Sequence, residues 1–295
     1  MTTALQLVQK QLNGLILGKN QVLDLVLACV LAKGHLLLED VPGVGKTTLA
    51  TGLAAVLGLT YQRVQFTNDM LPSDLLGVNV FHPQEARFTF HQGPVFNQFL
   101  LADEINRASP KVQSALLEAM EEGGVSLDAV HYRLPQPFWV VATQNPLFQS
   151  GTYALPESQL DRFLMRLSLG YPSRSAERAL LTDPSRQSLL SKLPEVFSSQ
   201  DLLVLQQLRQ HVTVSDAVLD YILDLAEKTR AGLQGLSTRG VIALKNATQA
   251  YALVQQRTFT TTDDVQAVFV AVAAHRIGLS ELETQQLMQR VPVSY

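Results

Sequence analysis

The order of apolar and polar residues divides the chain into two parts. Up to residue 172, short apolar runs alternate with segments in which apolar residues recur every three or four positions. The runs predict buried strands, and the recurring positions predict helices. The predicted strands are Leu36–Leu38, Tyr61–Phe66, Phe99–Ala102, Phe138–Thr143 and Met165–Leu169. This alternation predicts an α/β fold in which helices sandwich a parallel sheet.

The second part shows helical periodicity alone. Predicted helices cover Ala176–Leu190 with a break at Pro184, Ser199–Gln210, Ser215–Thr229, Arg239–Val254 and Thr262–Ile277. Helices that follow an α/β unit indicate a separate helical domain. We therefore expect an α/β core over residues 1–172, opened by helices at Leu5–Leu17 and Gln21–Ala32, and a smaller all-α domain over residues 176–295.

Two pairs of short strands interrupt the core pattern. The first pair, Val78–Phe81 and Arg87–His91, follows a segment at Asn68–Asp74 that we expect to be an irregular loop. The second pair, Val125–Leu127 and Val130–Leu134, turns at Asp128 and Ala129. Such pairs predict two β-hairpins inserted between core elements.

The composition is that of an ordinary globular protein. The 295 residues are 46% hydrophobic and 17% charged, with a net charge of −3, which gives no overall attraction to nucleic acid or anionic lipid. Cys29 is the single cysteine, which excludes an intrachain disulfide and a cysteine-rich metal site. Charged residues interrupt the longest apolar region, Val22–Leu38, so we read it as core and expect no membrane insertion. No amino-terminal stretch has the pattern of a secretion signal, and we expect a cytoplasmic protein.

The segment Leu36–Ala50 predicts a strand, a glycine-containing turn and the start of a helix. Backbone N–H groups in such a turn bind phosphate, and the helix dipole favours the negative charge. Lys46 can reach the terminal phosphates, and the Thr47 hydroxyl is placed to bind Mg²⁺. The usual pattern is G-x-x-x-x-G-K-[ST], and here Asp40 replaces its first glycine. The candidate nucleotide-binding residues are Pro42, Gly43, Val44, Gly45, Lys46, Thr47 and Thr48.

Polar residues follow two other predicted strands. Asp103 and Glu104 end one strand, and Asn145 comes directly after another. Carboxyl ends of neighbouring parallel strands meet at one edge, so these side chains are expected beside the phosphate turn. There Asp103 would bind Mg²⁺ together with Thr47, Glu104 would activate the water that attacks the γ-phosphate, and Asn145 would hold that water.

A bend at Ile16–Gly18 separates the first two predicted helices. Because it precedes the phosphate turn, this bend, with Gly18, could line a pocket for adenine. A simple turn between two helices explains the same residues equally well, and the sequence leaves both interpretations open.

Three longer segments resemble a known family. They are Arg63–Gly77 (RVQFTNDMLPSDLLG), Asp103–Glu122 (DEINRASPKVQSALLEAMEE) and Ala142–Pro146 (ATQNP). Together with the phosphate turn they are similar to MoxR-type AAA+ ATPases, from near Gly18 to Arg239. The resemblance implies a P-loop NTPase fold of the AAA+ type followed by an all-α lid, with ATP and Mg²⁺ as cofactors.

The resemblance also implies roles for single residues. Asn145 matches the sensor-1 position, Arg162 matches the arginine that enters the neighbouring subunit's site, and Arg239 matches sensor 2, which touches the nucleotide of its own chain. For Arg166 we expect a surface salt bridge. The family usually has proline before the sensor-2 arginine, where this sequence has Thr238.

The function implied is ATP hydrolysis that drives chaperone-like remodelling, metal insertion or assembly of a client complex. Family members form rings, usually hexamers, and typically work with a partner that bears a von Willebrand factor A domain. A nucleic-acid motor is one alternative, but the second predicted hairpin turns at Ser126–Val130, which is acidic and apolar where such a motor needs Lys or Arg. An ATP-gated scaffold with little turnover is another.

Overall fold

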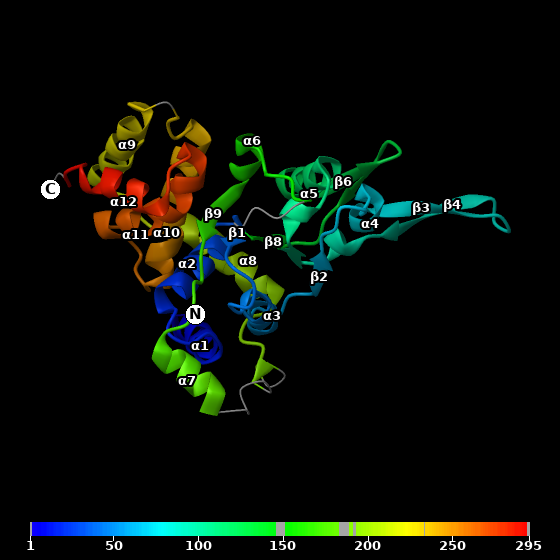
Figure 1. Ribbon diagram of the computed structural model, residues 1–295, viewed down its shortest axis with the longest axis horizontal. Coiled ribbons are helices and arrows are strands. Elements are labelled where there is room, and N and C mark those ends of the chain that lie inside the picture. The colour runs from blue at the N-terminus through cyan, green and yellow to red at the C-terminus, as the bar shows by residue number, and fades with distance from the viewer. Residues whose placement is uncertain (1, 146–150, 183–188, 191–192, 233, 294–295) are drawn as a thin grey trace.

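The computed structural model describes residues 2–145, 151–182, 189–190, 193–232 and 234–293. A central sheet carries helices on both sides, further helices gather at one end, and a hairpin projects from the other (Figure 1). The predicted break at Pro184 and the Pro146 of the ATQNP segment lie outside the described residues. Among the described helices, none has the length and apolar content needed to cross a lipid bilayer.

Five parallel strands form the main sheet, in the order β2–β5–β8–β1–β9. Their bounds are His35–Glu39 (β1), Tyr61–Gln65 (β2), Phe99–Asp103 (β5), Trp139–Gln144 (β8) and Phe163–Leu167 (β9). The first four lie within one residue of the predicted strands at each end, whereas β9 begins and ends two residues earlier than predicted. This confirms the parallel α/β fold.

Both faces of the sheet are buried. In β1, Leu36 and Leu38 belong to one apolar cluster and Leu37 to another, as expected where side chains alternate between two covered faces. The helices α1 (Thr2–Leu15), α2 (Asn20–Leu31) and α3 (Lys46–Val56) contribute to the first cluster. The helices α4 (Pro72–Leu76) and α5 (Pro110–Glu122) contribute to the second.

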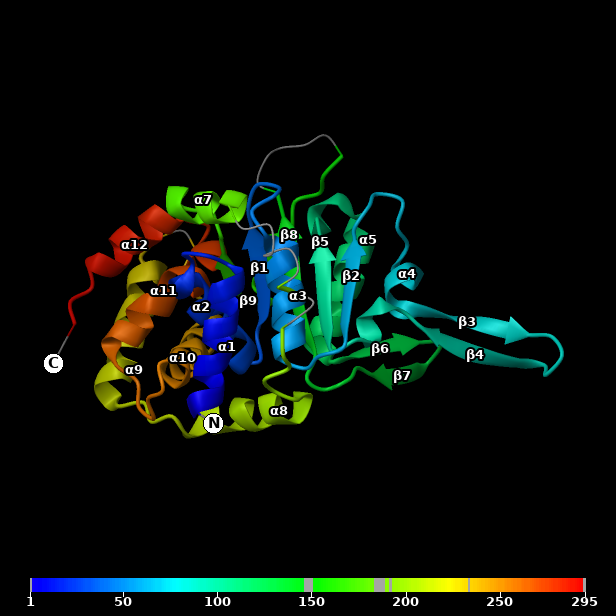
Figure 2. The same ribbon diagram turned by 90° about the horizontal axis from the view of Figure 1, so that it is seen from below.

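Both predicted hairpins are present, and Figure 2 shows them extending beyond the β2 side of the sheet. They are β3 (Gly77–His82) with β4 (Arg87–Gln92), and β6 (Gly124–Leu127) with β7 (Val130–Arg133). The expected loop at Asn68–Asp74 is partly wrong, because α4 begins at Pro72. Its first turn is closed by the Asp74 carboxylate, which accepts a hydrogen bond of 2.8 Å from the Leu71 N–H. Short helical segments join other elements: η1 (Pro94–Phe96), η2 (Ile105–Arg107) and α6 (Glu157–Leu160).

The described residues after 173 form helices, as predicted, and no strand. They are α7 (Arg174–Thr182), α8 (Ser199–Leu208), η5 (Arg209–His211), α9 (Asp216–Arg230), α10 (Thr238–Val254), α11 (Thr262–Ile277) and α12 (Glu281–Gln289). The sequence analysis missed α12. This helix begins with a capping box formed by Ser280 and Glu283.

The helical end packs directly on the core. The helix α10 lies against α2, and α11 lies against β9. Side chains of both helices, such as Leu244 and Phe269, belong to the same buried cluster as Leu27 of α2. This packing fixes where the first turn of α10 lies relative to the sheet. The domain boundary at residues 172–176 stays a prediction.

Candidate nucleotide-binding site

A pocket of about 390 Å³ lies at the carboxyl edge of the sheet, where β1, β5 and β8 end side by side. The predicted residues that line it are Pro42, Gly43, Gly45, Lys46, Thr47, Thr48, Asp103, Glu104 and Asn145. The lining further includes Arg63, Gln65, Thr143 and Gln144. Segments far apart in the sequence therefore meet around one hollow.

The turn between β1 and α3 has the conformation that phosphate binding requires. Gly43 and Gly45 adopt φ angles of 84° and 98°, in the left-handed region that glycine enters at little cost. The Lys46 ammonium donates hydrogen bonds to the backbone oxygens of Asp40 (2.7 Å) and Val41 (3.3 Å). Partial burial lowers the pKa of Lys46, and the charges of Asp40 and the two strand-end carboxylates oppose that shift.

Asp103 is fixed on both of its carboxylate oxygens. The Thr143 hydroxyl donates to Oδ1 at 2.6 Å, and the Arg63 guanidinium donates to Oδ2 from Nε at 3.1 Å and from Nη2 at 2.7 Å. Thr143 belongs to β8 and Arg63 to β2, the two neighbours of β5. Asp103 and the Thr47 hydroxyl line the same pocket, so their oxygens form a donor set suited to Mg²⁺.

Glu104 follows β5 with φ 56°, a left-handed conformation that is uncommon outside glycine. Its backbone N–H donates to the Thr143 hydroxyl at 2.9 Å, and its carboxylate accepts bonds of 2.9 Å from both Gln65 and Arg107. These bonds orient the carboxylate at the rim of the pocket. Backbone strain of this kind is typical of functional positions.

Sequence reasoning missed Arg63, Gln65 and Thr143. The alternation over Tyr61–Phe66 puts Arg63 and Gln65 on one face of a strand, which was the available signal. That signal does not say which strand lies next to β2. The pairing of β2 with β5 brings Arg63 beside Asp103 and Gln65 beside Glu104.

Two further predicted binding residues do not line the pocket. Val44 is within the phosphate turn but is not part of the lining. Gly18 lies next to Ser173, whose Oγ would be 3.7 Å from a Cβ at Gly18. The bend does approach the turn, since the Ile16 Cδ1 would be 3.8 Å from a Cβ at Gly45.

The structure places Arg162 and Arg239 away from this pocket. Both guanidiniums bind Glu121, at the end of α5, with Arg162 Nε at 2.7 Å and Arg239 Nη1 at 3.2 Å. The cleft that they line also includes His35, the first residue of β1, and so lies at the amino edge of the sheet. In this structure Arg239 does not line the phosphate pocket of its own chain. Helix α10 packs on α2, and Arg239 in its first turn lines this cleft, which we call the arginine cleft.

Arg166 forms a salt bridge, as predicted, but not an exposed one. Its guanidinium pairs with Glu39 at 3.2 Å, and both side chains are largely covered.

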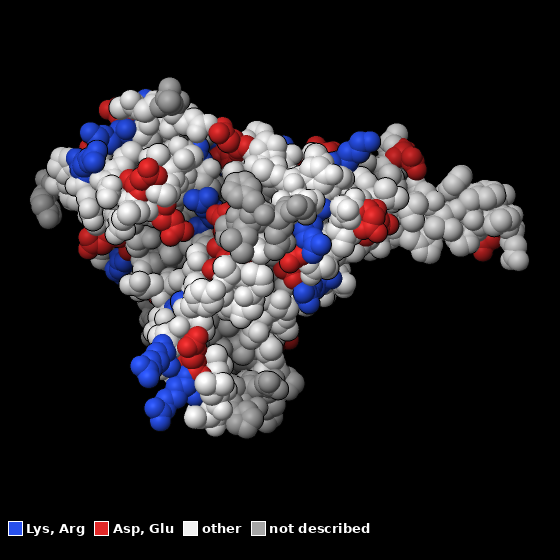
Figure 3. Space-filling model, in the orientation of Figure 1, with Lys and Arg blue, Asp and Glu red and all other residues white. Residues whose placement is uncertain are grey.

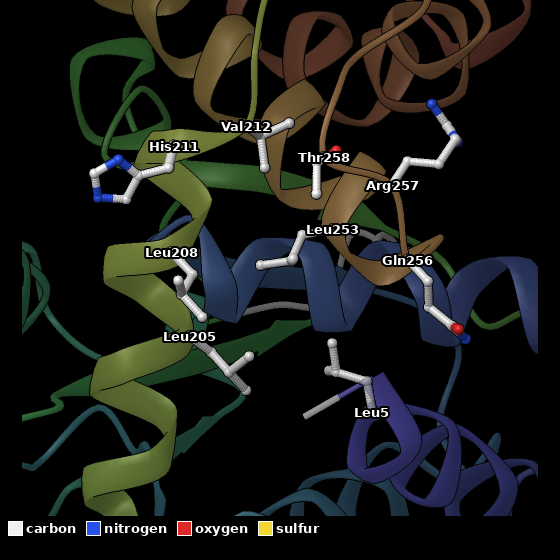
Figure 4. A pocket seen from close by; sticks show the side chains of 9 residues that line it. All are labelled: Leu5, Leu205, Leu208, His211, Val212, Leu253, Gln256, Arg257 and Thr258. Carbon is white, nitrogen blue, oxygen red and sulfur yellow. The ribbon is translucent and has the colours of Figure 1, made fainter.

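A second cavity, of about 250 Å³, lies between α1, α8 and the end of α10. Figure 4 shows Leu5, Leu205 and Leu253 pointing toward one another, while His211 points away from them. A lining of this kind, without a glycine turn or an acidic pair, does not suit a triphosphate.

The sequence matches the family model "ATPase family associated with various cellular activities (AAA)" over residues 35–165 and the AAA lid domain model over residues 227–292. It is 45% identical to the uncharacterised protein YeaC of Bacillus subtilis, covering 92% of this chain and 85% of YeaC. It is 39% identical to Chaperone MoxR1 of Mycobacterium tuberculosis, covering 92% of this chain and 74% of that protein. The chain belongs to the MoxR family of AAA+ ATPases.

A solved structure from Cytophaga hutchinsonii, described as that of a candidate ATPase, superposes on this MoxR-family protein with a TM-score of 0.89. The two are 33% identical, and the match covers 100% of this chain and 96% of the other. The AAA match runs from the start of β1 into β9 and so contains every residue of the pocket. The lid match begins within α9 and includes Arg239.

Proposed function

We propose that this protein hydrolyses ATP to ADP and phosphate, and that it works as a ring, with hexamers expected. The observation that carries the proposal is the gathering of Lys46, Asp103, Glu104 and Asn145 around one pocket behind a glycine turn. Each side chain has a type that phosphoryl transfer uses, and they come from three neighbouring strand ends.

The turn and the first residues of α3 bind the phosphates. The residues between Gly43 and Thr48 lead into the N-terminus of α3, where free backbone N–H groups and the helix dipole favour an anion. Lys46 exchanges its bonds to loop carbonyl oxygens for bonds to the terminal phosphates. Thr47 and Asp103 would hold Mg²⁺, which would supply neutralisation of the charge on the phosphates.

Glu104 acts as the base for the attacking water. Its bonds to Gln65 and Arg107, both on Oε2, keep it beside the pocket, and Oε1 would take the proton of the attacking water. Asn145 holds the same water through its amide. Arg63 pairs with the neighbouring Asp103 and holds its carboxylate at the pocket.

Arg162 and Arg239 act on the ATP of a neighbouring subunit. Strand β1 runs from His35, at the arginine cleft, to Glu39, at the phosphate turn. At about 3.3 Å per residue the two edges are roughly 13 Å apart, beyond the reach of an arginine side chain. A guanidinium supplied by another subunit offsets charge in the transition state and couples hydrolysis to assembly.

Hydrolysis drives remodelling or assembly of a protein client, as a chaperone does. The name of the relative MoxR1 supports this class of activity. We expect a partner with a von Willebrand factor A domain, and metal insertion is one form that the remodelling could take. No nucleic acid is expected, because residues 77–92 of hairpin β3–β4 contain a single Lys or Arg, Arg87, and no blue patch covers the face of the hairpin seen in Figure 3.

The test is the Glu104→Gln variant. Loss of the base should lower ATP turnover by about 100-fold or more, while binding of ATP stays intact because the phosphate turn is unchanged. Phosphate release and ATP binding are measured on the same preparation, with Glu118→Gln as a control. Glu118 lies on the exposed side of α5 and does not line the pocket. Turnover that survives in Glu104→Gln would refute the role of Glu104 as base.

A further inference from the structure

The arginine cleft at the amino edge of the sheet has a volume of about 280 Å³. It lies between the end of α5, the residues before β9 and the start of α10. Four cationic side chains, Lys33, Arg162, Arg239 and Arg276, and two carboxylates, Glu121 and Asp161, line it. The excess of positive charge suits a phosphate group that approaches from outside the subunit.

Glu121 joins the two arginines. Its Oε2 accepts a hydrogen bond of 2.7 Å from Arg162 Nε, and its Oε1 accepts one of 3.2 Å from Arg239 Nη1. Glu121 belongs to α5 of the core, Arg162 precedes β9, and Arg239 is in the first turn of the lid helix α10. One carboxylate therefore holds together guanidiniums from two parts of the chain.

The second carboxylate is bound differently. Asp161 accepts a bond of 2.7 Å from Arg276, which is only 4% exposed, and its other oxygen lies 4.0 Å from Arg239. Arg276 also donates to the backbone oxygen of Phe163 at 2.7 Å. This buried arginine anchors α11 to the start of β9. Asp161 therefore binds mainly Arg276, whereas Glu121 binds Arg162 and Arg239.

Both arginines stay open to a ligand while they are paired. The side chains of Arg162 and Arg239 are 29% and 51% exposed. The bond from Arg162 lowers the pKa of Glu121, so the carboxylate is ionised at neutral pH. Two guanidiniums with one carboxylate between them keep a net positive charge, and the carboxylate offsets their mutual repulsion.

We propose that Glu121 is a positioning residue that presents Arg162 and Arg239 as one preformed pair to the terminal phosphate of the ATP held by a neighbouring subunit. The inference rests on the proposed function. Two long side chains ordered in advance do not have to be ordered again in each catalytic cycle, which lowers the barrier. Without the carboxylate the two arginines would separate and act one at a time.

The experiment compares ATP turnover of Glu121→Gln with that of Glu122→Gln. Glutamine has nearly the same shape but no charge, so we expect kcat to fall about 10- to 100-fold, as misplacement of catalytic groups commonly does. The affinity for a fluorescent ATP analogue should not change, since Glu121 is outside the pocket, and this also verifies folding. Glu122 is the matched control, because it is exposed and forms no salt bridge with a described residue.

A second comparison separates positioning from a general structural role. In an Arg162→Ala/Arg239→Ala background, single-turnover hydrolysis of labelled ATP should be the same with and without Glu121→Gln, because the groups that Glu121 positions are gone. An equal loss in both backgrounds would overturn the inference. So would full activity of Glu121→Gln beside an active wild type, which leaves the proposed function standing. A wild type that does not hydrolyse ATP would overturn both.

Discussion

The carboxylate of Asp40 occupies the position at which the phosphate-turn pattern usually has its first glycine. Its backbone does not adopt a positive φ, so glycine is not required there. The side chain is buried and accepts hydrogen bonds from Leu169 N–H (2.6 Å), Ser168 Oγ (2.8 Å) and Gly170 N–H (2.9 Å). Beyond the end of β9 at Leu167, the N–H groups of Leu169 and Gly170 thus donate to a side chain. The substituted residue ties the phosphate turn to the chain after β9.

Replacement of Asp40 by Ala should therefore destabilise the protein. The N–H of Leu169, a buried residue, would lose its partner, and we expect a loss of about 2–4 kcal/mol in the free energy of unfolding. Urea denaturation measures it. Asp220→Ala is the control, because Asp220 is exposed on α9. Equal stability of the two variants would contradict the structural role of Asp40.

Among the elements, hairpin β3–β4 is attached to the core by its base, and one of its faces packs against hairpin β6–β7. On that face Phe90 stacks on Tyr132 with ring centroids 4.1 Å apart, and Asn79 donates to Asp128 at 2.6 Å. At the base, Gly93 is packed against backbone: a Cβ there would be 2.3 Å from the Leu75 oxygen and 2.5 Å from the Gly77 nitrogen. Only glycine fits this approach.

The Gly93→Ala variant should lower the free energy of unfolding by about 1–3 kcal/mol, because backbone atoms must move to admit the methyl group. Amide hydrogen exchange should rise in β3 and β4 more than in the main sheet. Gly14→Ala is the matched control. A Cβ at Gly14 meets no atom within 4 Å. Because alanine favours the helix more than glycine does, Gly14→Ala within α1 should raise the free energy of unfolding by about 0.5–1 kcal/mol. A Gly93→Ala protein as stable as the wild type would show that the base can relax.

At the scale of the whole molecule, the phosphate pocket and the arginine cleft lie at opposite edges of one sheet. Under the proposed function each subunit therefore supplies half of two different sites. An interface that joins two unlike surfaces in this way generates rings when its rotation closes. Hydrolysis and assembly are then linked by geometry.

Mixing of two inactive variants tests this arrangement. Lys46→Ala removes phosphate binding, and Arg162→Ala removes the arginine given to the neighbour, so each alone should have little turnover. In a random equal mixture, roughly a quarter of the boundaries combine an intact pocket with an intact arginine, and turnover should recover to that extent. Phosphate release of the mixture is compared with that of each variant alone. No recovery, with exchange of subunits verified, would mean that Arg162 acts within its own chain.

The sequence by itself determined the elements and the phosphate turn, because both depend on residues that are close together in the chain. Apolar runs defined four strands to within one residue, and the turn before Lys46 was recognisable from its glycines. It also indicated that Asp103, Glu104 and Asn145 would meet, since parallel strands end at one edge. The capping box of α12, Ser280 with Glu283, is also a local signal in the sequence, although the helix was not predicted from it.

Only the tertiary structure decided which strands are neighbours and where the helical domain packs. The place of β2 beside β5 gives Asp103 its Arg63 partner, and no local pattern encodes that order. Helix α10 packs on α2, and Arg239 in its first turn pairs with Glu121 of α5. Contacts of this kind join residues far apart in the chain, and the burial of whole helix and strand faces selects them.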